Sequence, residues 1–461
     1  MGTDDTLSYV GDTRGDSSLH VVAPYLVIAL ECHRPLAWPA RLGLATVQEV
    51  RLGRAAARSH ARERHEGVHL LEIGLPDSWM SSAHATVRRD GAAWMLTDGG
   101  SKNGTFLNGR RCRSARVADG DLIEVGSTLI LFRDPPTDRL GDRVDVTEAE
   151  LEAEPEGLRT VSPLMAARLR GLARVAGADI PVVLHGETGT GKEVVARAIH
   201  RMSNRSGSFV AVNCGALPAT LIESELFGHR QGAFSGATAD RPGLVRSADR
   251  GTLFLDEVAE LPAPSQIALL RVLQEREVRP VGGTAAVPVD LRVIAATHQD
   301  LPARVEAGSF REDLYARVAG ITVTLPPLRE RREDLGLLLR ALLPAIAGPR
   351  ADGLRLSREA GRALIEYAWP RNVRELEHAL RAAVALADDT IEVAHLPEPV
   401  GHTGAPAAAE DPADQALREQ LLGLLEQEAG NVRAVARALG KAPVQIYRWC
   451  KRLAIDLDRY R

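Results

Sequence analysis

Residues 186–192 place a glycine-rich turn between an apolar run and a helical run, and this order constrains the fold more than any other feature. The apolar run is 181–184, and the helical pattern follows at 193–199. In such a turn, glycines let backbone amides surround phosphate oxygens, and the helix N-terminus adds positive partial charge. We predict a parallel α/β domain with this phosphate-binding loop (P-loop): Gly186, Glu187, Thr188, Gly189, Thr190, Gly191, Lys192 and Glu193.

An acidic motif downstream supports the same chemistry. The apolar run 253–255 ends in Asp256 and Glu257. A carboxylate in this place can hold Mg²⁺, directly or through water, and the next one can orient the attacking water. An isolated Asp-Glu pair is more often a solvated strand end, but its place after a P-loop favours catalysis. We predict an ATPase with ATP and Mg²⁺ as cofactors, Asp256 at the metal and Lys192 at the β- and γ-phosphates.

The bulk composition limits the other possibilities. A chain of 461 residues suits about three domains. The 57 basic and 61 acidic residues leave a net charge of −4, so any nucleic-acid surface must be local. Four cysteines fit no metal or disulfide spacing and indicate reduced thiols. No apolar run approaches the ~20 residues of a membrane span, so we expect a cytoplasmic protein without a membrane partner.

Two stretches of biased composition divide the chain. Residues 134–157 are acidic and contain several prolines, and residues 401–413 consist mainly of Gly, Ala and Pro. Both compositions are typical of linkers. We therefore expect three domains, at 20–133, 158–400 and 414–461.

Residues 232–237 read Gly-Ala-Phe-Ser-Gly-Ala and lie between the P-loop and the acidic motif. The hexapeptide closely resembles the GAFTGA signature of bacterial enhancer-binding proteins, which are AAA+ ATPases that remodel RNA polymerase holding the alternative factor sigma-54. Ser235 replaces the family's Thr and keeps the hydroxyl. An exposed aromatic is costly in water unless it has a partner, and the resemblance implies that Phe234 and Ser235 contact sigma-54. In a lone Gly-x-Phe, a buried Phe would be favoured instead.

The same resemblance assigns roles around the nucleotide. Asn213 corresponds to a polar switch that restrains the glutamate of the acidic motif, and Thr297 and His298 correspond to the first sensor. Arg311 and Arg317 correspond to arginines that act in trans, which means that they reach the nucleotide site of a neighbouring subunit. A guanidinium is always charged and can stabilise transition-state charge there. The resemblance thus implies a homo-oligomeric ring, a hexamer.

Three further correspondences concern the P-loop and the helical lid of this family. Arg374 corresponds to the second sensor, which reads the γ-phosphate. Arg371 replaces the family's Gly, and would re-aim this sensor if the turn requires a positive φ. Glu193 stands where the general P-loop has Ser or Thr for magnesium, but Glu is usual in this family.

The N-terminal domain resembles a forkhead-associated (FHA) domain, a β-sandwich that binds phosphothreonine peptides. The motifs that carry the resemblance are 51–54, 81–84 and 100–105. Hairpin signals at Asp90-Gly91 and Asn108-Gly109 predict the same all-β fold. The resemblance implies that Arg54 and Ser81 bind the phosphate and Asn103 the peptide backbone.

The implied FHA partner is a phosphothreonine protein, the product of a Ser/Thr kinase. Two positions depart from the family: Ser82 replaces a basic residue, and Lys102 replaces Thr or Ser. An FHA fold that serves only as a protein-contact module is the alternative.

The C-terminal residues 431–453 resemble the Fis-like helix-turn-helix of the same activators and contain six basic residues and no acidic one. This local charge is typical of DNA binding. We expect Arg448, Lys451 and Arg452 to contact phosphates of enhancer DNA and Gln445 to read a base. A basic helix pair used for dimerisation is the alternative.

Together these features predict a multidomain activator of the sigma-54 RNA polymerase holoenzyme: an all-β FHA sandwich, an α/β AAA+ ATPase with a helical lid, and an all-α helix-turn-helix. Two alternatives are an AAA+ remodeller of another protein and an FHA scaffold with a weak motor. The intact Lys192, Asp256 and Glu257 argue against the second.

Overall fold

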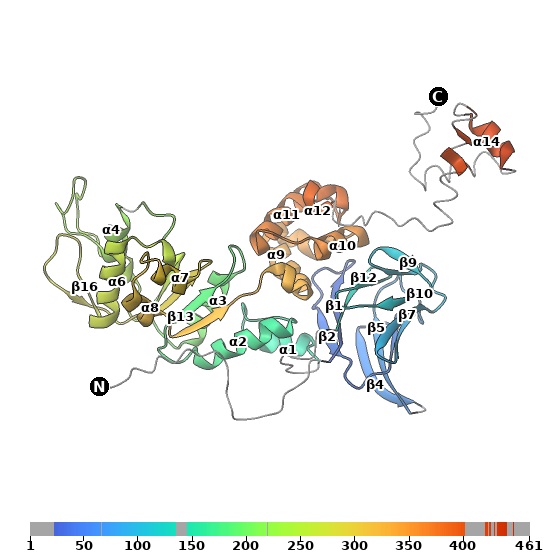
Figure 1. Cartoon of the computed structure of the whole chain (residues 1–461), viewed down its shortest axis with the longest axis horizontal. Helices are drawn as coiled ribbons and strands as arrows, with labels where there is room; N and C mark the ends of the chain where they lie inside the picture. The colour runs from blue at the N-terminus through green and yellow to red at the C-terminus, as the bar shows by residue number, and fades with distance from the viewer. Residues whose placement is uncertain are drawn as a thin grey trace. The chain divides into compact units, whose positions relative to one another are not determined.

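The computed structural model describes residues 23–401 apart from 66, 135–144 and 219, residues 420–439 apart from 423, 426, 427, 429 and 430, and residue 446. The chain divides into two compact units, Met1–Gly404 and Ala405–Arg461 (Figure 1). Within the first unit we distinguish a β-sandwich (23–134), an α/β core (158–325) and a helical lid (328–401).

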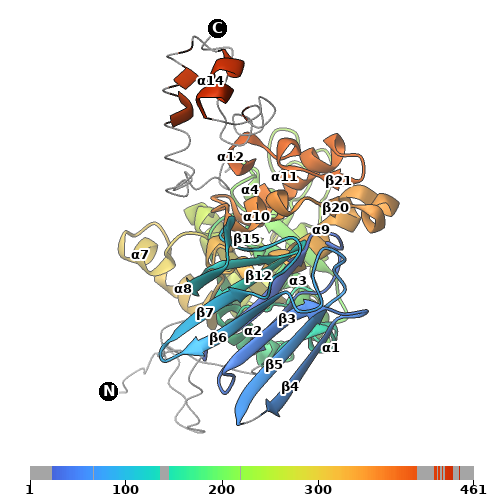
Figure 2. The same cartoon turned by 90° about the vertical axis from the view of Figure 1, so that its right-hand side faces the viewer.

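The β-sandwich consists of two six-stranded sheets (Figure 2). The first contains, in spatial order, β2 (Ala40–Gly43), β1 (Tyr25–Glu31), β12 (Thr128–Arg133), β11 (Leu122–Val125), β8 (Thr105–Leu107) and β9 (Arg110–Cys112). The second contains β10 (Ser114–Val117), β7 (Ala93–Asp98), β6 (Ala85–Asp90), β3 (Glu49–Arg54), β5 (Val68–Leu75) and β4 (Ser59–His65). The all-β prediction for this domain is confirmed.

Both predicted hairpins are present. Gly91 joins β6 to β7 with φ of 60°, and Asn108 and Gly109 join β8 to β9 with φ of 50° and 78°. Tight hairpin turns need this left-handed backbone, which Gly and Asn adopt at low cost. Between the sheets lies an apolar core that includes Leu26, Ile28, Val50, Trp94 and Phe132.

The α/β core contains a five-stranded sheet in which every neighbouring pair is parallel. Its spatial order is β14 (Phe209–Asn213), β15 (Thr252–Asp256), β18 (Arg292–Thr297), β13 (Val182–His185) and β19 (Ile321–Thr324). Successive side chains point to opposite faces, so Leu253 and Leu255 enter one apolar core and Phe254 the other. The carboxyl ends of the strands meet at one edge, where the P-loop, Asp256 and Thr297 lie.

Helices on both faces cover this sheet: α2 (Pro163–Val175), α3 (Lys192–Met202), α4 (Ile222–Phe227), α5 (Leu244–Ser247), α6 (Ala263–Glu275), α7 (Leu301–Glu306) and α8 (Glu312–Val318). A short 3-10 turn, η1 (Val258–Glu260), follows β15, and a small hairpin pairs β16 (Glu277–Val278) with β17 (Val287–Pro288).

The lid is mainly helical. It contains η2 (Leu328–Glu330), η3 (Arg332–Asp334), α9 (Leu335–Ala347), η4 (Gly348–Gly353), β20 (Arg355–Leu356), α10 (Arg358–Glu366), α11 (Asn372–Leu386), β21 (Thr390–Ile391), η5 (Val393–His395) and α12 (Glu398–Gly401). The α/β prediction with a helical lid agrees with these elements.

The β-sandwich and the lid share one apolar core, with α9 and α10 beside β1 and β12 (Figure 1). Strand β1 is buried on both faces because Leu26 and Ile28 enter the sandwich, while Val27 and Ala29 pack with the lid. A Cβ on Gly336 of α9 would lie 2.1 Å from the Ala29 carbonyl oxygen. Such close packing requires glycine at that place.

Part of the expected linker 134–157 is folded. Val146 forms a backbone bridge with Arg41 of β2, and α1 (Glu148–Ala153) follows. Leu151 of α1 is buried in the core shared by the sandwich and the lid. The sequence-based linker assignment missed this because one leucine among several glutamates carries little apolar signal, although it suffices to dock one helical turn.

In the second unit, α14 (Val432–Ala438) packs in a small apolar cluster with Leu421, Leu425 and Ile446. The predicted DNA contacts Gln445, Arg448, Lys451 and Arg452 lie outside the described residues. The helix-turn-helix therefore stays a prediction.

Across the part of the chain that the structure describes, no helix has both the length and the hydropathy needed to cross a membrane.

Candidate nucleotide and phosphopeptide sites

The P-loop connects β13 to α3 as predicted. Gly186, Gly189 and Gly191 have φ of 154°, 82° and 98°, a backbone that side chains rarely adopt. Lys192 is buried at the first position of α3, and its Nζ donates to the carbonyl oxygens of Gly186 (2.8 Å) and Glu187 (3.2 Å). Burial lowers the pKa of Lys192. The loop thus holds a desolvated cation at a helix N-terminus, an arrangement suited to phosphate.

Asp256 and Glu257 face Lys192 from the end of β15. Burial, and next the neighbouring Glu257 carboxylate, raise the pKa of Asp256, while Lys192 opposes the rise. A half-buried carboxylate beside a second one fits a hard divalent cation that completes its shell with water and phosphate oxygens. Both residues lie at the end of β15, and their roles at the metal and at the attacking water stay predictions.

Glu257 is bound by His298. Its Oε2 accepts a hydrogen bond of 2.7 Å from His298 Nδ1, and its backbone is left-handed with φ of 52°. Asn213, the predicted partner, instead accepts bonds from the amides of Gly215 and Ala216, both at 3.0 Å. Its strand pairs with β15, opposite Asp256. The predicted switch residue thus lies beside the acidic motif, and its Oδ1 accepts from amides of its own turn.

Thr297 is fully buried beside the P-loop. Its carbonyl oxygen accepts from the Gly186 amide at 3.1 Å, and its Oγ1 accepts from the Gln299 amide at 3.0 Å. The predicted first sensor therefore borders the nucleotide loop directly.

The lid contacts the P-loop through residues that sequence reasoning missed. Arg329 donates two hydrogen bonds to the Glu187 carboxylate, at 2.9 and 2.6 Å. Arg331 is buried and donates to the Thr190 carbonyl oxygen at 2.7 Å. Asn372 donates to the Thr188 carbonyl oxygen at 3.1 Å. No local motif separates these side chains from ordinary surface residues in the sequence. Their contacts arise only because the folded lid lies against the P-loop.

Arg374, the predicted second sensor, lies over the same loop. A Cβ on Gly189 would lie 3.2 Å from Arg374 Cβ and 2.4 Å from the Arg371 carbonyl oxygen. Arg371 itself has φ of −108°, whereas Trp369 and Asn372 carry the positive φ values of this turn. The change from Gly to Arg at 371 is therefore free of backbone strain.

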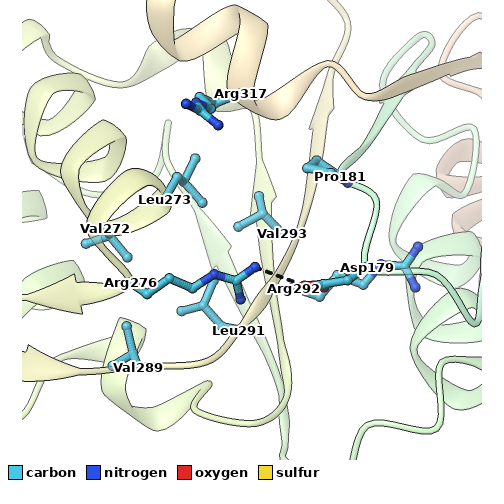
Figure 3. Close-up of a pocket in the computed structure, with 10 residues that line it drawn as sticks. All are labelled: Asp179, Pro181, Val272, Leu273, Arg276, Val289, Leu291, Arg292, Val293 and Arg317. Carbon is cyan, nitrogen blue, oxygen red and sulfur yellow. Dashed lines mark hydrogen bonds and ion pairs between the residues drawn. The ribbon is translucent and has the colours of Figure 1, made fainter.

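Arg311 immediately precedes α8, and Arg317 lies in the last turn of this helix. Arg311 is exposed and pairs with Asp313 at 2.7 Å. Arg317 lines a hollow of about 210 Å³ together with Arg276, which is paired with Asp179 at 3.1 Å (Figure 3). The action of both arginines in trans stays a prediction.

Phe234 lies on a loop between α4 and α5. Gly232 and Gly236 have φ of 81° and 111°, and a Cβ on either would meet no atom within 4 Å. The Phe234 residue is 39% exposed, and its ring meets the ring of His229 edge-on, with 5.0 Å between centroids. Ser235 precedes Gly236 on the same tip. The aromatic is thus neither fully buried nor fully extended into water.

The three predicted phosphopeptide residues lie together. The Arg54 amide donates to the Ser81 carbonyl oxygen at 2.9 Å, and Ser81 Oγ accepts from the Lys102 amide at 3.1 Å. Asn103 donates through Nδ2 to the carbonyl oxygen of Trp79 at 2.8 Å. Sequence reasoning missed Trp79, whose indole is 61% exposed beside these loops.

His84 braces the loops of this site. It is buried, its Nδ1 accepts from the Ser81 amide at 3.1 Å, and its Nε2 lies 3.2 Å from the Gly104 carbonyl oxygen. Burial lowers the pKa of His84. A neutral ring with Nε2 protonated satisfies both bonds and ties the 81–84 loop to the 100–105 loop.

Comparisons with known proteins identify the domains that carry these sites. Residues 158–324 match the sigma-54 interaction domain, residues 329–413 the AAA+ ATPase lid domain, and residues 50–126 the FHA domain. The transcriptional regulatory protein GlrR of Escherichia coli K12 is 41% identical over 310 residues, which cover 66% of this chain and 70% of GlrR. The response regulator protein PilR of Pseudomonas aeruginosa is 41% identical over 349 residues, covering 73% and 76%.

Among solved structures, NtrX from Brucella abortus in complex with ADP is 32% identical and has a TM-score of 0.49, covering 64% of this chain and 69% of NtrX. With the P-loop, the acidic motif and the lid in place, the central domain is an AAA+ P-loop ATPase domain that binds nucleotide. The chain belongs to the family of transcriptional regulatory proteins that carry the sigma-54 interaction domain, and it carries an FHA domain in addition.

Proposed function

We propose that this protein activates transcription by remodelling the closed complex of sigma-54 RNA polymerase, using ATP hydrolysis to move the Phe234 loop. The half-exposed Phe234 between two sterically free glycines carries the proposal. A partly exposed aromatic that meets His229 edge-on can leave this contact and bind another apolar surface. Phe234 and Ser235 would then form the contact with sigma-54.

The chemistry rests on charges held around the γ-phosphate. Lys192 would bind its oxygens, Asp256 would hold Mg²⁺, and Glu257 would orient the attacking water. The bound Mg²⁺ would offset negative charge on the phosphates. Arg374 would read the γ-phosphate from the lid, and Arg311 and Arg317 would reach the site of a neighbouring subunit in a ring, which we propose to be a hexamer.

We propose that the FHA domain controls this motor by binding a phosphothreonine protein. Arg54 and Ser81 would bind the phosphate, and Asn103 the peptide backbone. Lys102 would add a second cation, because its amide already donates to Ser81 Oγ. This charge would compensate for Ser82, where the family has a basic residue.

The shared core of the sandwich and the lid supports a direct route for this control. A partner that shifts the sandwich must also move the lid, since α9 and β1 pack without a gap at Gly336. The lid in turn contacts the P-loop through Arg329 and Arg331. Phosphoprotein binding would thus alter nucleotide affinity or turnover.

For the second unit we propose enhancer-DNA binding, with Gln445, Arg448, Lys451 and Arg452 as contacts. Its support is the six basic residues between 431 and 453 without an acidic one.

The test separates hydrolysis from coupling. Phe234→Ala should keep ATP hydrolysis but lose open-complex formation on a sigma-54 promoter. Ser235→Thr, which only adds a methyl group, should keep both activities, and Asp256→Ala should lose both. Normal activation by Phe234→Ala would refute the contact. Hydrolysis without a response from any sigma-54 promoter would favour an AAA+ remodeller of another protein.

A further inference from the structure

The base of the Phe234 loop is held by backbone contacts on two sides. The His229 amide donates to the Arg241 carbonyl oxygen at 3.0 Å, and the Arg241 amide donates back to the His229 carbonyl oxygen at 2.9 Å. On the other side, the Val281 amide donates to the Gly228 carbonyl oxygen at 2.8 Å. A Cβ on Gly228 would lie 2.4 Å from the Arg241 carbonyl oxygen, so no side chain fits between these segments. The backbone of His229 is therefore fixed in place.

The His229 side chain is fixed as well. The residue is 7% exposed, and its Nδ1 forms a hydrogen bond of 2.6 Å with the Ser224 Oγ. Ser224 is buried on α4, whose Leu226 and Phe227 enter an apolar core of the α/β domain. A buried ring with a satisfied hydrogen bond has little freedom to rotate. His229 thus presents its ring in one orientation.

The tip that carries Phe234 is closed upon itself. The Ala237 amide donates to the Phe234 carbonyl oxygen at 3.0 Å, and the Gly232 amide donates to the Ala237 carbonyl oxygen at 2.9 Å. These two bonds lie within the tip, so a displacement of the whole tip leaves them intact. The ring contact between Phe234 and His229 therefore joins a movable side chain to a fixed one.

We infer that His229 is a positioning residue for the partner-binding loop: its ring, anchored by Ser224, holds Phe234 in a docked position. Only molecules in which Phe234 has left His229 then offer this side chain to an apolar partner surface. A group that is docked in most molecules binds its partner with an affinity reduced by the open fraction. The inference rests on the proposed contact with sigma-54 and names the residue that restrains it.

The first experiment observes Phe234 without any partner. The full chain contains seven Phe residues, and labelling with 4-fluorophenylalanine gives each of them a fluorine NMR signal. The spectrum of Phe234→Leu identifies the signal of residue 234. In the wild type this signal should be displaced from that of free fluorophenylalanine, because the neighbouring His229 ring shifts it. His229→Ala should move it toward the free value.

Two further variants separate the ring from its anchor. His229→Phe keeps an aromatic ring beside Phe234 and should keep the signal displaced from the free value. Ser224→Ala removes only the hydroxyl that fixes the imidazole and should move the signal part of the way toward the free value. Ser247→Ala, which changes an exposed serine on α5, is the matched control and should leave the signal unchanged.

The second experiment measures binding of the full chain to purified sigma-54 in the absence of nucleotide. His229→Ala should bind about two- to tenfold tighter than the wild type, because an edge-on pair of rings shifts an equilibrium constant by about that factor. His229→Phe should bind like the wild type. In a Phe234→Ala background, adding His229→Ala should have no effect, because the docked side chain is already gone.

The outcomes separate this inference from the proposed function. The thermal unfolding midpoint of each variant should stay within a few degrees of the wild type. If His229→Ala unfolds, Ser224→Ala provides the same test. An unshifted signal of residue 234 in the folded variant, or a gain in binding that persists in the Phe234→Ala background, would overturn the inference. A wild type that binds sigma-54 in no nucleotide state would refute the proposed contact, while the fluorine signals still decide whether His229 holds Phe234.

Discussion

The Glu124 carboxylate of the β-sandwich is fully buried and accepts hydrogen bonds from Arg362 of the lid at 3.0 and 3.1 Å. The Gly109 amide donates to the same carboxylate at 2.7 Å, and Arg358 lies 3.2 Å from it. Arg358 also stacks on Phe106, with 3.9 Å between guanidinium and ring centroid. A buried carboxylate must keep its partners, so this cluster holds the sandwich to the lid.

Replacing Arg362 should weaken the contact between the β-sandwich and the lid. Arg362→Met leaves Glu124 with fewer donors and should lower the free energy of local opening by about 1–3 kcal/mol. Native-state hydrogen exchange should show faster exchange in β11 and α10. Arg381→Met is the matched control, because Arg381 pairs with Glu377 on the exposed face of α11. Equal exchange in both variants would contradict a stabilising role for the cluster.

Arg362→Met also tests whether the FHA domain controls the ATPase activity. If phosphothreonine binding acts through the contact between the β-sandwich and the lid, a bound phosphopeptide should change the ATPase rate of the wild type and change that of Arg362→Met less. An identical response in both proteins would indicate another route.

Phosphopeptide binding should depend on the Arg54 and Ser81 side chains. The double change Arg54→Ala with Ser81→Ala removes two charge-assisted bonds, so affinity should fall roughly 100-fold or more. Calorimetry of the full chain against a phosphothreonine peptide library measures this. Arg64→Ala, an exposed arginine on β4, should bind like the wild type. Equal binding of phosphorylated and unphosphorylated peptides would mean that the FHA domain is a contact module only.

The loop that carries Asn103 should lose stability in acid. Burial alone would raise the pKa of Asp98, but hydrogen bonds from Ser101 and Thr105 outweigh it and lower this pKa. Because the folded-state pKa of Asp98 lies below its unfolded value of about 4, the ionised carboxylate stabilises the fold above pH 4. This contribution is lost as pH falls through the folded-state pKa. Asp98→Asn should therefore destabilise the sandwich at pH 7 and by less near about pH 2, as measured by hydrogen exchange of β7 and β8. An equal effect at both pH values would contradict this.

DNA affinity should fall steeply with salt if residues 414–461 bind enhancer DNA, because each neutralised phosphate releases a counterion. Deleting these residues should raise the protein concentration needed for activation and leave ATP hydrolysis intact. A filter-binding assay at several salt concentrations would measure the slope. Unchanged affinity after the deletion would favour a dimerisation role.

The sequence by itself determined the features that lie within consecutive residues. The P-loop, the acidic strand end at Asp256 and the hairpin at Asn108-Gly109 each depend on a few neighbouring side chains and on backbone freedom of glycine. Such local chemistry is visible without coordinates. The Phe234 loop belongs to the same class, because its two glycines and its aromatic stand side by side in the chain.

Only the tertiary structure decided which distant groups meet. Whether Asn213 or His298 binds Glu257 depends on strand order and register, which a motif does not contain. Glu124, Arg331 and Arg362 look like surface charges in the sequence, since a charged residue carries no mark of burial. Glu124 and Arg331 become buried, and the Arg362 side chain nearly so, because β1, β12 and α9 expose apolar faces that must be covered. Covering these faces also removes the charged groups from water.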